Sequence, residues 1–179
     1  VDGWGGDDAG DFTLRITGPD TLNDPAPMVR IPAGQFFRGA TSDNQPAAER
    51  PVRRITLGEY EIDRHEVTVA QYRACVDAGR CPEPSSGDGC NWGIAGNDDH
   101  PINCLSWSEG HNYCVQVGKR LPTEAEWEKA ARGGCEMHGT PDCVGDDDAV
   151  SYPWGNAPPP DCDRAWLVTC DEGRTAPAP

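Results

Sequence analysis

The chain contains few basic residues, with 15 Lys and Arg against 30 Asp and Glu, which gives a net charge of −15. This imbalance argues against binding to nucleic acid or to an anionic membrane, because both interactions need basic surface. The sequence also lacks an apolar run of the ~20 residues that a membrane-spanning helix requires. We therefore expect neither a nucleic-acid partner nor a membrane span.

Hydrophobic residues are also scarce, at 36%, whereas 21 Gly and 17 Pro are present. This composition is low in apolar residues for a helical protein and predicts many turns and long ordered loops. A chain of 179 residues is long enough for one domain of ordinary size. The sequence begins at Val1 without a Met and ends at Pro179, and we expect both ends to be cuts within a longer protein.

No Cys-x-x-Cys motif is present, and no His lies at zinc-finger spacing from a Cys, which argues against a zinc cluster. The sequence nevertheless contains nine cysteines, and this density is typical of an oxidising compartment. We therefore expect a secreted, cell-surface or periplasmic protein.

Eight cysteines are close neighbours in sequence and predict four local disulfides, namely Cys75–Cys81, Cys90–Cys104, Cys135–Cys143 and Cys162–Cys170. The ninth, Cys114, lies on the apolar side of a predicted helix, and we assign it as the cysteine that keeps its thiol. Other pairings stay open, because spacing alone does not prove connectivity.

Three segments carry the start signal of a helix, a Thr or Ser followed three residues later by Gln or Glu. The predicted helices run from Thr68 to about Asp77, from Ser106 to near Gly118, and from Thr123 to Gly133. In the third helix, the four-residue spacing of Glu128 and Arg132 predicts an ion pair. Its predicted apolar stripe consists of Trp127, Ala130 and Ala131.

Alternating apolar residues predict strands at residues 11–17, at two places within 28–39, and at 52–62. A lone strand cannot bury itself, so we interpret residues 1–18 as the terminal strands of a preceding β domain. Residues 19–27, rich in Pro, Asn and Asp, predict a linker. The main module then extends from Met28 to Pro179.

Six ordered blocks within this module resemble one known family. They read MVRIPAGQF at 28–36, YEIDRHEVT at 60–68, HPINCLSW at 100–107, GKRLPTEAEWEKAARGG at 118–134, YPWGN at 152–156 and RTAP at 174–177. Together they resemble the formylglycine-generating enzymes, also called sulfatase-modifying factors. Residues 1–18 resemble the last hairpin of a bacterial pre-peptidase C-terminal β-sandwich domain.

The resemblance implies an irregular, turn-rich α+β fold with few regular elements, similar to that of C-type lectins, of which these residues are the N-terminal part. It also implies copper-dependent oxidation of a sulfatase cysteine to formylglycine by oxygen. Copper(I) is a soft ion, and thiolates are suitable ligands for it. The family's two active-site cysteines lie beyond the blocks found here, and no cysteine of this chain matches them. We therefore expect no catalytic residue in the chain. It would need the remainder of its own polypeptide, or a complementing chain, to act.

A few acidic residues and histidines are candidates for metal sites of other kinds. Members of the family bind calcium after the YPWG block, and Asp163 and Asp171 lie nearest to those positions. The acidic run 146–148 is interpreted as a solvated loop. His65 and Glu66 are adjacent, but we favour a structural role for them, because no second His follows at helical ligand spacing.

Three functions remain as hypotheses. The first is the N-terminal part of a formylglycine-generating oxidase, and the second is a non-catalytic lectin-like module for recognition of a protein or glycan, or for assembly. The third is an oxidase of the family that uses non-haem iron, although no two-His-one-carboxylate pattern is visible. Trp92, on a predicted loop, is the best candidate for surface recognition, whereas Trp107 and Trp127 are predicted to pack in the core.

Overall fold

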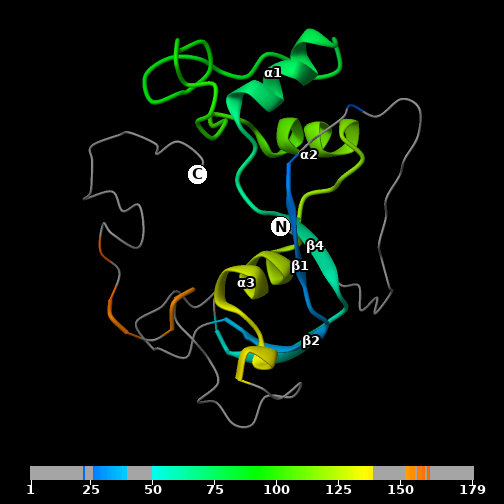
Figure 1. Cartoon of the computed structure of the whole chain (residues 1–179), viewed down its shortest axis with the longest axis vertical. Coiled ribbons are helices and arrows are strands. Elements are labelled where there is room, and N and C mark those ends of the chain that lie inside the picture. Colours follow the sequence, from blue (N-terminus) through cyan, green and yellow to red (C-terminus); the bar gives the residue numbers. More distant parts are fainter. Residues whose placement is uncertain are drawn as a thin grey trace. The chain divides into compact units, whose positions relative to one another are not determined.

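The computed structural model describes residues 22, 26–39, 50–138, 152–155, 157–159 and 161 (Figure 1). These residues form short strands and short helices, so the α+β class is confirmed. The elements are β1 (Met28–Ile31), β2 (Gly34–Arg38), β3 (Arg53–Leu57), β4 (Tyr60–Asp63), α1 (Val69–Asp77), α2 (Trp107–Gln116), α3 (Glu124–Arg132) and the 3₁₀ helix η2 (Cys135–His138). The strand predicted at 11–17 lies outside the described residues. Among the described helices, none has the length and apolar character needed to cross a membrane.

The strands form two two-stranded sheets rather than one hairpin. β2 pairs antiparallel with β3, with Phe36 opposite Ile55, and β1 pairs with β4. The single strand predicted over 52–62 is therefore wrong. It is interrupted at Gly58 and Glu59, and its two halves belong to different sheets. The alternating pattern did predict strand conformation on both sides of the break.

All three predicted helix starts are confirmed. Thr68, Ser106 and Thr123 each accept a hydrogen bond from the backbone three residues on, and the Gln or Glu there bonds back to the cap. Hydrogen bonds from the Ser106 side chain and backbone hold the pKa of Glu109 below its ordinary value. The third helix ends at Gly133, whose φ of 84° favours glycine, as the sequence predicts.

The chain divides into two compact units, described separately below. Among the described residues, the first unit contains 30–39, 50–62, 122–138, 152–155 and 157–158. The second contains 22, 26–29, 63–121, 159 and 161. The division passes through β1 and β4, so each of these strands contributes to both units.

In the first unit, α3 packs on β2 through a buried charge. The side chain of Lys129 has no exposed area, and its Nζ donates to the carbonyl oxygens of Pro32 at 2.6 Å and Gly34 at 3.3 Å. Its carboxylate partner is Glu136 in η2, at 3.4 Å. A buried ammonium group is tolerated only when paired and hydrogen-bonded, and these three oxygens meet that need.

The far end of β2 is held by α3 as well. Glu128 accepts a hydrogen bond from the Gly39 N–H at 2.8 Å, and Arg132 donates to the Gly39 carbonyl at 2.9 Å. Arg132 and Glu128 also form the predicted ion pair, at 2.5 Å. Figure 1 shows α3 beside β2, and the two helical side chains thus satisfy both backbone groups of one residue.

The predicted apolar stripe of α3 is wrong. Trp127 is 61% exposed, whereas Lys129 is the buried residue of the helix. The face that packs on β2 is therefore formed by charged side chains that bind backbone groups. Trp107 on α2 is likewise exposed, at 70%, and does not pack in the core.

The second unit has an aromatic and disulfide-linked core. Tyr72 of α1 and Tyr113 of α2 stack with ring centroids 5.6 Å apart, and Cys75 and Cys81 complete the buried cluster. Leu22, in the predicted linker, packs against this cluster, and its N–H donates to the Gln116 carbonyl at 2.9 Å. At least one residue of the 19–27 segment is therefore part of the packed unit.

Tyr60 joins β4 to α3 within the first unit. Its buried hydroxyl donates to the Glu126 carbonyl at 2.5 Å. Burial is the largest cause that raises the pKa of Tyr60, and the negative charges of Glu126 and Glu136 raise it further. The hydroxyl therefore stays protonated in the folded state over a pH range where an unfolded tyrosine ionises.

We predict that Tyr60→Phe lowers the free energy of unfolding by about 1 kcal/mol near neutral pH, because one hydrogen bond is lost. When the pH rises above 10.0, the ordinary pKa of tyrosine, the difference in free energy of unfolding between the wild type and the variant should shrink. Ionisation of the unfolded state destabilises the wild type there, and the variant lacks this group. Urea unfolding of both proteins at neutral and alkaline pH measures the two effects. A difference that stays constant with pH would contradict the assignment.

Candidate functional site

Two disulfides hold the loop between α1 and α2 in place. Cys75 pairs with Cys81 across the end of α1, and Cys90 pairs with Cys104 across the loop. Both pairings are those predicted from the sequence. Cys135 is also disulfide-bonded, whereas Cys143, its predicted partner, lies outside the described residues. The predicted pair Cys162–Cys170 lies outside them too.

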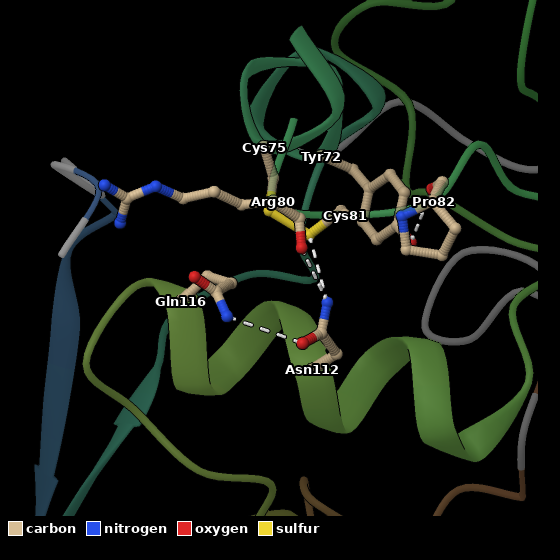
Figure 2. Close-up of a disulfide and its surroundings, with 7 residues drawn as sticks. All are labelled: Tyr72, Cys75, Arg80, Cys81, Pro82, Asn112 and Gln116. Atoms are coloured by element: carbon tan, nitrogen blue, oxygen red, sulfur yellow. Dashed lines mark hydrogen bonds between the residues drawn. A yellow bond between two sulfur atoms is a disulfide. The ribbon is translucent and has the colours of Figure 1, made fainter. Parts of the chain in front are cut away.

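Side chains of α2 contact the segment that contains the Cys75–Cys81 disulfide (Figure 2). The amide of Asn112 donates to the Arg80 carbonyl at 3.0 Å and lies 3.8 Å from the Cys81 sulfur. Gln116 donates to the Asn112 side chain at 3.5 Å, and Figure 2 shows both residues pointing from α2 toward the Arg80–Cys81 segment. Cys75 and Cys81 are buried, so this disulfide is structural rather than reactive.

Tyr72 of α1 packs in the same buried cluster as this disulfide. Its hydroxyl donates to the Pro82 carbonyl at 3.2 Å, which ties α1 to the start of the loop. Burial, and to a smaller extent the charge of Glu109, raises the pKa of Tyr72. The hydroxyl therefore serves as a neutral hydrogen-bond donor and not as a base.

The buried Asn91 and the half-buried Asn97 and Asn103 organise the rest of the loop. The Asn91 N–H donates to the Asn103 side chain at 2.7 Å, and the Asn91 amide donates to the Pro101 carbonyl at 2.7 Å. Asn97 donates to Asn91 at 3.2 Å, and Asn103 donates to the Gly89 carbonyl at 2.7 Å. Sequence reasoning missed this network, because asparagines in a Gly-rich loop look like ordinary turn residues.

Trp92, the predicted surface-recognition residue, belongs partly to the core. It is half-buried and meets Tyr72 edge-to-face, with centroids 6.1 Å apart. Arg73 lies over its ring at 5.7 Å and pairs with Asp98 at 2.6 Å. One face of the indole is thus covered by a cation that the protein itself supplies.

His65 and Glu66, for which we favour a structural role, form no metal cluster within the described part of the chain. No three His, Cys, Asp or Glu side chains gather there as a metal would require. His65 and His100 are half-buried, and His111 stacks on Trp107 with centroids 5.0 Å apart. The predicted calcium ligands Asp163 and Asp171, and the acidic run 146–148, lie outside the described residues.

A copper site like that implied by the resemblance does not fit the described residues. Copper(I) prefers thiolate ligands. Among the described cysteines, Cys114 is a reduced thiol, half-buried on α2, and the others are in disulfides. One thiol cannot form a pair of thiolate ligands, so the described cysteines do not form such a copper site. The described histidines likewise do not form the two-His-one-carboxylate set of non-haem iron.

Comparison with known proteins decides the family. A model of the sulfatase-modifying factor enzyme 1-like domain matches residues 14–172. The chain belongs to the sulfatase-modifying factor family. The match begins before Met28, so it includes the predicted linker and residues 14–17 of the strand predicted before it.

Two relatives within the family differ in what their names state. A formylglycine-generating enzyme of Bos taurus is 30% identical, and the match covers 74% of this chain and 43% of that protein. An inactive C-alpha-formylglycine-generating enzyme 2 of Bos taurus is 28% identical, and the match covers 91% of this chain and 62% of that protein. The chain spans about half the length of the formylglycine-generating enzymes that it matches.

Among solved structures, one match is a crystal structure of CarF. It has 22% identity and a TM-score of 0.47, and the match covers 72% of this chain and 62% of CarF.

We predict that replacing Cys75 and Cys81 together by Ala lowers the free energy of unfolding by roughly 2–3 kcal/mol, because a short loop is no longer closed. Cys114→Ala is the matched control. It removes a half-buried sulfur from the same core without opening a disulfide, and it should cost less than the double replacement. Denaturant unfolding compares the variants. Equal losses in both would show that the disulfide does not stabilise this core.

Proposed function

We propose that this chain is the scaffold part of a sulfatase-modifying factor domain in a secreted protein, and that a longer protein containing it oxidises a protein cysteine to formylglycine. Support for the activity comes from the family and from relatives named as formylglycine-generating enzymes. In this proposal the reacting thiols come from another part of the domain. The 179 residues alone are then inactive.

The state of the cysteines carries this proposal. Five described cysteines are in disulfides, and Cys114 keeps its thiol on a helix that packs against the core. Reactive cysteines need thiolate character and access, a cysteine held in a disulfide has no thiolate, and the Cys75–Cys81 pair is buried as well. The described residues therefore supply structure, and the oxidative chemistry needs cysteines from elsewhere.

Location and calcium are part of the same proposal. The disulfides of the described cysteines support an oxidising compartment, which a secreted, cell-surface or periplasmic protein would meet. We keep Asp163 and Asp171 as proposed calcium ligands, and a lectin-like arrangement of the complete domain as the proposed fold. Copper is proposed only for the longer, active protein.

A second candidate function is a non-catalytic module for recognition or assembly. The match to relatives named as inactive C-alpha-formylglycine-generating enzyme 2 favours it, because the same family includes members without the activity. Both functions share the scaffold described above. They differ in whether a longer protein containing this segment carries the reacting cysteines.

We predict that the purified 179-residue chain does not convert a cysteine-containing sulfatase peptide to formylglycine in the presence of copper and oxygen. Mass spectrometry of the peptide measures the conversion. The longer protein containing this segment should give the product under the same conditions. Product formed by the 179 residues alone would overturn the scaffold proposal, whereas no product from the longer protein would favour the non-catalytic alternative.

A further inference from the structure

Helix α2 exposes a continuous stripe of large side chains, here called the α2 stripe. It consists of Trp107, His111 and Val115, which follow one another at intervals of four residues and so share one face of the helix. Trp107 is 70% exposed and Val115 is 50% exposed, and His111 is exposed as well. The indole and imidazole rings stack at 5.0 Å with an interplanar angle of 8°, so the stripe presents an ordered aromatic surface.

Other faces of α2 are already occupied within the second unit. Tyr113 is 3% exposed and stacks on Tyr72, and Asn112 bonds to the Arg80 carbonyl. A helix with apolar side chains on more than one face is typical of an element covered on more than one side. An exposed apolar patch of this kind marks an interaction surface in many soluble proteins.

The comparisons indicate what covers the stripe. α2 lies inside the matched family domain, and the matched relatives contain about as much sequence again as this chain spans. We propose that the α2 stripe is the surface on which the remaining part of a sulfatase-modifying factor domain docks, the part that these relatives carry and these 179 residues do not span. This inference rests on the proposed function, in which that part supplies the reacting thiols.

The shape and charge of the stripe fit a polypeptide element. From its first residue to its last, the stripe extends about 12 Å along the helix axis, which matches a helix or strand packed lengthwise. None of its three residues carries a carboxylate, although the chain has a net charge of −15. The nearby Glu109 is engaged with its cap, Ser106. An apolar surface within an acidic protein fits an apolar partner better than a charged one.

The test is co-expression of the tagged 179-residue chain with the part of the bovine formylglycine-generating enzyme that lies outside the match. The amount of co-purified complex is quantified by size-exclusion chromatography and native mass spectrometry. We expect a one-to-one complex, and we expect Trp107→Ser to reduce its yield at least about tenfold, as is typical for a central tryptophan of an interface. Ile94→Ser is the matched control, because Ile94 is 51% exposed on the loop and lies outside the stripe. It should leave the yield unchanged.

Three outcomes would overturn the proposal. They are no complex with the wild-type chain, equal loss in both variants, and self-association of the chain that Trp107→Ser abolishes, which would make the stripe an interface between copies. Melting temperatures of both uncomplexed variants equal to that of the wild-type chain would show that neither change acts through folding. Because complex formation is measured without activity, a complex that forms but yields no formylglycine would leave the docking proposal standing and count against the proposed oxidase.

Discussion

The first unit depends on one buried ammonium group. The side chain of Lys129 is fully buried. Its ammonium group donates hydrogen bonds to the carbonyls of Pro32 and Gly34 and pairs with the carboxylate of Glu136. An unpaired charge in this position would be strongly destabilising, so these three oxygens must stay in place for the unit to fold. The Pro32 carbonyl lies in the turn between β1 and β2, the Gly34 carbonyl lies at the start of β2, and the carboxylate lies in η2. This set of polar contacts thus joins α3 and η2 to the start of β2.

Other contacts of α3 follow the same principle. Glu128 and Arg132 bind both backbone groups of Gly39, and Tyr60 binds the carbonyl of Glu126. The helix therefore holds the sheet mainly through hydrogen bonds to backbone, and its tryptophan faces outward. The second unit is built differently, from stacked tyrosines and a buried disulfide. Within the described part of the chain, each unit uses its own kind of core.

Local signals predicted local structure well. The three capping boxes, the Glu128–Arg132 pair and the disulfides Cys75–Cys81 and Cys90–Cys104 all involve residues close in sequence. The failures concern partners that are far apart. Lys129 meets carbonyls 95 and 97 residues away, so the local pattern suggested that Trp127 and not Lys129 faces inward. The separation of β3 from β4 likewise depends on pairing with different partner strands. Family membership could be predicted because six blocks occur in order, whereas the Asn91 network gives no local signal.

The central claim is that the buried contacts of Lys129 hold the first unit together. Its most direct test is the free energy of unfolding of Lys129→Met, with Lys119→Met as the control. Lys119 pairs with Asp63 at 2.6 Å in the second unit, and its side chain keeps 16% exposure. Lys129→Met should lose about 3–5 kcal/mol, because the Glu136 carboxylate loses its cationic partner and two backbone carbonyls lose their donor, and it should lose more than the control. A loss no greater than that of Lys119→Met would contradict the account.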